Sequence, residues 1–98
     1  MSQLTLIAKW KAKPGAEDRL YEALRSLVEP TLAEQGCINY DLHRSIEDPG
    51  LFMFYENWTS RPLWERHMES QHLQEFSANT EDIVEVWELF QGEKVDAV

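Results

Sequence analysis

The chain has 98 residues, 43% of them hydrophobic and 28% charged, which is the composition of a single globular domain over residues 1–98. Eighteen acidic and nine basic residues give a net charge of −9, so nucleic acids and anionic membrane surfaces are poor partners. No apolar run approaches the ~20 residues of a membrane span, no signal-type stretch begins the chain, and Cys37 has no second cysteine to pair with. These features favour a cytoplasmic protein.

The first part of the chain changes from a strand pattern to a helix pattern. Residues 4–11 place apolar side chains at every second position, which predicts a strand. A helical period follows from residue 16 to about residue 35, and Gly36 ends it. Pro30 lies inside this helix and predicts a kink or a split near the third turn, because proline lacks a backbone N–H.

A hairpin is predicted next. Residues 37–45 alternate between apolar and polar side chains, and residues 51–58 form the most apolar strand of the chain. The residues between them, 47–50, read Glu-Asp-Pro-Gly, which combines several turn signals. Two short strands around such a turn are typical of a hairpin.

The last part repeats the change from helix to strand. Thr59 or Ser60 caps a second helix, and Ser70 caps a short helix behind it. Residues 83–90 form a final strand, and residues 91–98 are expected to be a flexible tail. The order β-α-β-β-α-β predicts an α+β, ferredoxin-like fold: one antiparallel sheet with the helices on one face.

The strand at 51–58 is apolar on both faces, although the predicted helices cover only one. A large exposed apolar patch marks an interface, and a second copy of the chain is the simplest cover. We therefore expect a homodimer in which two sheets pack face to face as an α/β barrel. The alternative is a monomer that exposes a few aromatic side chains.

The three histidines are the first candidates for chemistry. His67 and His72 are five residues apart, a spacing that does not suit two ligands on one helical turn, and no nearby carboxylate completes a triad, so no metal site is predicted. His67 is either a core histidine bonded to a backbone carbonyl or a general base. His72 is either a base or a residue of the cap region. His43 is expected at an interface or in solvent.

Aromatic side chains are the second group of candidates. Most must lie in the core, yet so many large rings can leave a flat apolar pocket between helices and sheet. Glu56 stands among them and must be paired or stay protonated; it is either a structural ion-pair partner or a pocket group. The scattered glycines form no phosphate-binding loop, so flavin, NAD and nucleotide sites are unsupported. The aromatic candidates for a substrate pocket are Tyr40, Tyr55, Trp58, Trp64 and Phe76.

An ordered set of short motifs resembles the antibiotic biosynthesis monooxygenase (ABM) domain family over residues 4–91. The set reads Gly-Cys, Tyr, Asp-Pro, Glu-x-Trp and His-x-x-Ser-x-His, here Gly36-Cys37, Tyr40, Asp48-Pro49, Glu56-Asn57-Trp58 and His67 to His72, with Phe76 behind it. The resemblance implies a dimeric α/β barrel of ferredoxin-like subunits. It also implies a cofactor-free, quinol monooxygenase-like activity on a small phenolic or polycyclic aromatic substrate with O2.

In that interpretation a base deprotonates the substrate, and the anion passes an electron to dioxygen. By resemblance, His67 and His72 are the base or orient the substrate, and Tyr55 and Trp58 line or support the pocket. A haem-degrading branch of the family uses an Asn on the first strand, and residues 4–11 contain none.

Two other functions stay open. The first is an isomerase of a small carbonyl compound such as a sugar phosphate, for which Arg44, Arg61 and Arg66 are the nearby cations. The second is a non-catalytic, dimeric ligand-binding module, because one fold supports many functions.

Overall fold

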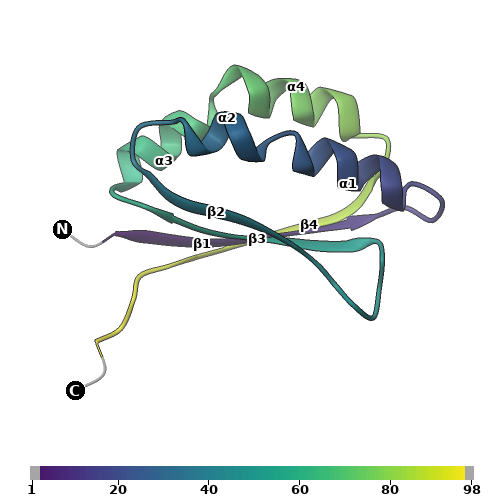
Figure 1. The fold of residues 1–98 in the computed structure, drawn as a ribbon, viewed down its shortest axis with the longest axis horizontal. Helices are drawn as coiled ribbons and strands as arrows, with labels where there is room; N and C mark the ends of the chain where they lie inside the picture. Colours follow the sequence, from purple (N-terminus) through teal and green to yellow (C-terminus); the bar gives the residue numbers. More distant parts are fainter. Residues whose placement is uncertain (1–2, 97–98) are drawn as a thin grey trace.

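The computed structural model describes residues 3–96. Its four strands form one antiparallel sheet in the order β2-β3-β1-β4. All the helices lie on one side of this sheet (Figure 1). The observed order and pairing confirm the predicted α+β, ferredoxin-like fold. The elements are β1 (Leu4–Ala12), α1 (Glu17–Arg25), α2 (Val28–Leu32), β2 (Cys37–Arg44), β3 (Leu51–Trp58), α3 (Arg61–Met68), α4 (Gln71–Thr80) and β4 (Val84–Gly92).

The helix predicted over residues 16–35 is split into α1 and α2, as Pro30 indicates. Pro30 is the third residue of α2, where a backbone N–H has no partner inside the helix and its absence costs little. In one continuous helix that N–H would have bonded to the carbonyl of Ser26, the residue at which α1 is capped. The break therefore falls where proline removes the hydrogen bond.

Two serines start the helices of the second half. Ser60 caps α3 by accepting the N–H of Leu63, and Ser70 caps α4 by accepting the N–H of Leu73. Both caps confirm the predicted helix starts. The last strand extends to Gly92, because Gln91 and Gly92 still pair with β1. The prediction of a flexible tail was therefore wrong for these two residues. Residues 97–98 of the predicted tail lie outside the described residues.

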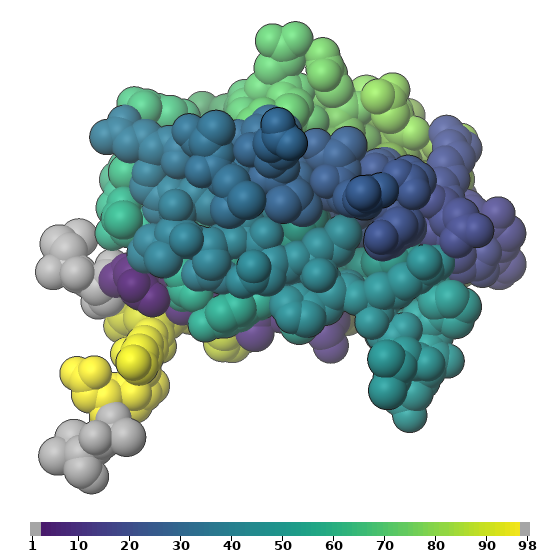
Figure 2. Space-filling view, viewed as in Figure 1, coloured from purple at the N-terminus to yellow at the C-terminus, as the bar shows by residue number. Residues whose placement is uncertain are grey.

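The core lies between the sheet and the helix layer. In the space-filling view the helix layer lies directly against the sheet (Figure 2). Even-numbered residues of β1 and β3 point into the core, since the side chains of a strand alternate. A large apolar cluster fills most of this layer, and a smaller one lies beneath α3. The large cluster includes Trp10, Leu20, Leu24, Phe52, Phe54 and Phe76, and the small one consists of Leu4, Leu6, Trp58 and Trp64.

In the part of the chain that the structure describes, the other face of the sheet carries no helix (Figure 1). Tyr55, Val86 and Phe90 point to this side and are 41%, 45% and 58% exposed. That a second copy covers them stays a prediction. Within residues 3–96, no helix has the length and apolar character needed to cross a membrane.

Candidate functional site

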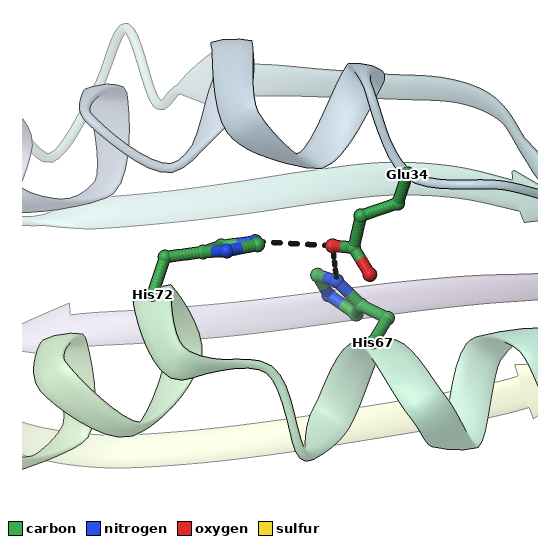
Figure 3. Close-up of side chains that lie close together, drawn as sticks. All are labelled: Glu34, His67 and His72. Atoms are coloured by element: carbon green, nitrogen blue, oxygen red, sulfur yellow. Dashed lines mark hydrogen bonds and ion pairs between the residues drawn. The ribbon is translucent and has the colours of Figure 1, made fainter.

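Three titratable side chains from separate elements meet at one end of the covered layer. Glu34 lies in the loop between α2 and β2, His67 in the last turn of α3 and His72 in the first turn of α4 (Figure 3). One carboxylate oxygen, Oε2 of Glu34, lies 2.6 Å from Nδ1 of His67 and 3.0 Å from Nε2 of His72. Because a carboxylate only accepts, each ring nitrogen that faces it donates a hydrogen. The lone pair of each neutral ring is then at its other nitrogen.

The break between α3 and α4 brings the two histidines together. On one continuous helix, residues five apart would point about 140° away from each other. Here α3 ends at Met68 and Ser70 caps a new helix, α4. Both rings therefore turn toward Glu34 (Figure 3). No carboxylate near the histidines in sequence pointed to such a cluster, but Glu34, 33 residues before His67, supplies one.

The loop that carries Glu34 is fixed by Gly36. This glycine has φ +91°, a conformation that other residues rarely adopt. A Cβ added there would lie 2.6 Å from Cδ1 of Leu63, so the loop approaches α3 more closely than a side chain allows. Gly36 thus turns the chain into β2 and holds Glu34 against the helix that carries His67.

Aromatic rings enclose His67. The Trp58 ring centroid lies 4.7 Å from that of His67, and the Tyr40 ring contacts it edge-on at 5.5 Å. The His67 side chain is only 2% exposed, whereas Glu34 and His72 keep 17% and 25% of their side-chain surface. His67 is therefore the inner member of the site, and His72 and Glu34 are its partly exposed members.

Burial sets the protonation of the inner groups. Desolvation lowers the pKa of His67, and the adjacent Glu34 carboxylate opposes this effect. Desolvation raises the pKa of the Tyr40 hydroxyl, with a smaller contribution from the charge of Glu56. At neutral pH, Tyr40 is therefore a neutral phenol, and His67 resists becoming a cation.

Glu56 is a second buried carboxyl group of this region. It is 4% exposed and accepts a hydrogen bond of 2.9 Å from Nε1 of Trp58, a neutral donor. Burial raises its pKa to about 7, although the Trp58 bond acts in the opposite direction. Within residues 3–96 the hydrogen-bond partner of Glu56 is therefore an indole N–H and not a cation, and an ion pair across a dimer stays a prediction.

The predicted aromatic residues do not all join this site. Tyr40 and Trp58 contact His67, and Trp64 packs against Trp58 in the small core cluster. Phe76 lies farther along the helix layer and lines an apolar groove between α4 and β4. Tyr55 points to the opposite face of the sheet, away from both histidines. The groove has a volume of about 290 Å³ and is lined by Trp10, Met68, Leu73, Phe76, Ser77, Thr80, Glu81, Val84 and Trp87.

Several other candidates have partners elsewhere. Arg44 donates to the carbonyl of Pro49 and to Asp18, and Arg61 donates to Gln91. His43 is exposed and bonds the carbonyl of Asp41 on its own strand. Neither guanidinium joins the Glu34 cluster, which weakens the case for a sugar phosphate beside the histidines.

Cys37 fits its interpretation as a structural thiol. Its Sγ donates a weak bond of 3.6 Å to the carbonyl of Asn39. Burial, together with the charges of nearby carboxylates, raises the pKa of the thiol to about 11. At neutral pH Cys37 is therefore protonated and a poor nucleophile.

Sequence reasoning missed Glu34 and Thr31. Thr31 is fully buried, and its Oγ1 lies 3.2 Å from Nε2 of His72. The available signal was weak: a glutamate and a threonine in the last turns of a predicted helix, shortly before the glycine that ends it. Their importance depends on partners more than 30 residues away.

Comparisons with known proteins agree with this architecture. A family model described as "Antibiotic biosynthesis monooxygenase" matches residues 3–79. The chain is 31% identical over 83 residues to "Putative monooxygenase Rv0793" of Mycobacterium tuberculosis, covering 85% of this chain and 81% of that protein. It is 28% identical over 81 residues to "Putative monooxygenase YcnE" of Bacillus subtilis, with 83% and 85% covered. The crystal structure of PA3566 from Pseudomonas aeruginosa matches with a TM-score of 0.94 at 36% identity, covering 98% of this chain and 97% of that one.

Proposed function

The chain belongs to the antibiotic biosynthesis monooxygenase family, and from this premise we propose that it is a monooxygenase that oxidises a small phenol or quinol with dioxygen. The observation that carries the proposal is the Glu34–His67–His72 cluster beside the rings of Trp58 and Tyr40. It combines a proton acceptor with aromatic walls, which are the two features that this chemistry asks of a protein.

In the proposed reaction His72 is the base, because it is the more exposed of the two histidines. Its Nε2–H donates to Glu34, so Nδ1 holds the lone pair that accepts the phenol proton. Glu34 then stabilises the imidazolium that forms, as a carboxylate does in other carboxylate–histidine pairs. His67, held on the same oxygen, is a positioning residue that fixes the carboxylate.

The substrate supplies the electrons. Its phenolate gives one electron to dioxygen, and superoxide then combines with the ring radical to form a C–O bond. The imidazolium returns its proton to the peroxide. Loss of the ring C–H proton and cleavage of the O–O bond leave a quinone and one water molecule, so phenol plus O2 gives quinone plus H2O. No flavin is needed in this scheme.

The apolar groove between α4 and β4 is the proposed place for the rest of the substrate. Its lining includes Met68 and Leu73, which follow His67 and His72 in the sequence, whereas the two histidines themselves are not among its lining residues. Its volume of about 290 Å³ is at the small end for ligand pockets and suits one or two fused rings. A wider hollow of about 810 Å³ near β2 has a mixed lining, in which Tyr21 and Tyr40 stand beside four charged side chains, so it is less apolar than the groove; the charged residues are Arg25, Glu29, Asp41 and Arg44.

Oxygen uptake with a panel of reduced naphthoquinols and anthrones tests the proposal, with spontaneous oxidation subtracted. We expect turnover by the wild type and a loss of about 10²- to 10⁴-fold in His72→Gln, the range typical of a missing general base. With ¹⁸O2, one labelled atom should appear in the quinone. His43→Gln, which removes the exposed histidine, is the matched control and should keep full activity.

Two results would overturn the proposal. One is oxygen uptake no faster than background for every substrate, which would favour a ligand-binding module. The other is deuterium exchange into a ketose or dione without oxygen uptake, which would favour an isomerase.

A further inference from the structure

We infer that Glu34, His67 and His72 form a binding site for one divalent transition-metal ion, a property separate from the proposed oxygenation. The three donor atoms are Oε2 of Glu34, Nδ1 of His67 and Nε2 of His72. They lie within 4.8 Å of one another and come from three different elements (Figure 3). Two imidazoles and one carboxylate are a recurrent ligand set for zinc and non-haem iron.

The two distances from the Glu34 oxygen to the histidine nitrogens are close to those that an ion requires. Two ligand atoms about 2.1 Å from an ion, at angles between a right angle and a tetrahedral angle, lie about 3.0–3.4 Å apart. The oxygen of Glu34 lies 2.6 Å from one histidine nitrogen and 3.0 Å from the other. The three donor atoms lie within 4.8 Å of one another, so an ion binds once the carboxylate withdraws by a few tenths of an ångström and the two ring nitrogens approach to about 3.4 Å.

The two imidazole rings can exchange the hydrogens that face Glu34 for a metal ion. In the metal-free site Glu34 accepts two N–H hydrogens, one from each histidine. An ion takes the place of these two hydrogens when each ring shifts to its other tautomer. Both histidines stay neutral, which is the form that binds metals.

The surroundings favour an ion with open coordination positions. Oγ1 of Thr31 and Oγ of Ser70 lie 3.2 Å and 3.4 Å from Nε2 of His72, so two hydroxyl groups are placed to bond water molecules held by the ion. Glu34 and His72 are partly exposed, which provides an entry path, whereas His67 anchors the site from within. The net charge of −9 attracts cations to the protein as a whole.

The donor set also selects the kind of ion. Mg²⁺ and Ca²⁺ prefer oxygen ligands and six or more positions, so a site with two imidazoles does not suit them. Zn²⁺ and Co²⁺ bind such sets with three protein ligands and one or two further positions. The ion uses the Glu34 oxygen that orients the proposed base, so the metal-bound protein is a different state from the one that would accept the substrate proton.

Titration calorimetry of the full chain with ZnCl2, after treatment with a chelator and dialysis, tests the inference. We expect one equivalent of Zn²⁺ to bind, and Co²⁺ to give a visible absorption band of a four- or five-coordinate ion. Glu34→Gln and His72→Gln should each weaken Zn²⁺ binding at least tenfold. His43→Gln, which lacks the exposed histidine, should bind Zn²⁺ like the wild type, and Mg²⁺ should not compete.

The inference is overturned if Zn²⁺ does not bind at one equivalent. It is also overturned if Glu34→Gln binds Zn²⁺ like the wild type, or if His43→Gln loses the binding. Thermal unfolding of each metal-free variant identifies those that are folded, and the nearly isosteric Glu34→Gln is the variant chosen to keep its shape. Because the assay contains no substrate, its result stands whether or not the protein consumes oxygen.

Discussion

The layer between sheet and helices has two halves that are chemically opposite. Around Trp10 and Phe54 the rings and leucines bury apolar surface, which directly favours folding. Around His67 the same layer buries imidazole and carboxyl groups, which cost free energy unless each finds a partner. Within residues 3–96, no buried side-chain nitrogen or oxygen lacks a hydrogen-bond partner. The first half therefore stabilises the fold, and the second holds a cluster of hydrogen-bonded polar groups.

The largest effect on stability is expected in the apolar half. Phe54 is fully buried, stacks on Tyr40 at 4.1 Å and contacts Trp10 edge-on. Phe54→Ala leaves a cavity there and should lower the free energy of unfolding by about 3–5 kcal/mol. Urea denaturation at fixed protein concentration measures it. Leu32→Ala, on the exposed side of α2, is the control and should cost under about 1 kcal/mol.

In the polar half, replacing the buried Glu56 should raise the free energy of unfolding at high pH, whereas replacing Phe54 lowers it. The pKa of Glu56 is 4.5 in an unfolded chain and about 7 in the folded protein, so between these values the folded state holds a proton that the unfolded state has lost. The contribution of Glu56 protonation to the free energy of unfolding is fully present below pH 4.5 and is lost as the pH rises through 7. The difference corresponds to about 3 kcal/mol.

Glu56→Gln removes this titration and should make the protein more stable than the wild type at pH 8, with a smaller gain at pH 5. Denaturation of both proteins at the two pH values measures the effect. An equal change at both values would show that Glu56 does not titrate in this range.

The open face of the sheet extends the comparison, because its apolar groups are exposed rather than buried. If two copies pack through this face, the contact is expected to include Phe90, which is 58% exposed there. Phe90→Glu should then weaken association by about 2 kcal/mol or more, roughly 30-fold. Sedimentation equilibrium measures it, with Glu65→Gln on the outer side of α3 as the control. A wild type that stays monomeric at high micromolar concentration would contradict the predicted dimer.

The smallest effects separate two serines with the same structural role. Ser60→Ala and Ser70→Ala each remove a helix cap and should each lower the free energy of unfolding by about 1 kcal/mol. Only Ser70 also contacts His72, at 3.4 Å. We therefore expect Ser70→Ala to lower oxygen uptake while Ser60→Ala does not. Equal activity in the two variants would show that the Ser70 contact has no role in the reaction.

Most of the fold could be predicted because its signals are local. Alternation located every strand to within two residues at either end, and Pro30 and the two serines marked helix breaks and starts. The same alternation places Tyr55 and Phe54 on opposite faces of the sheet. The sequence pattern therefore already indicated that Tyr55 lies on the face away from the helices and their histidines.

The site could be predicted only in part. The two histidines stood out because few residue types accept protons at neutral pH. Glu34 did not, since its role depends on a turn at Gly36 and on contacts with residues 33 and 38 positions away. Glu56 was identified as buried, but its indole partner could not be distinguished from a cation without coordinates.

The central claim is that the Glu34–His67–His72 cluster takes part in the proposed oxidation, and a substitution of Glu34 tests it most directly. The measurement is kcat for oxygen uptake by Glu34→Gln, compared with Glu65→Gln, which makes the same change on the exposed side of the neighbouring helix. If Glu34 orients and stabilises the base, its loss should lower kcat by about 100-fold or more in a protein that still folds, and the control should match the wild type. A folded Glu34→Gln within twofold of the wild-type kcat would contradict the account.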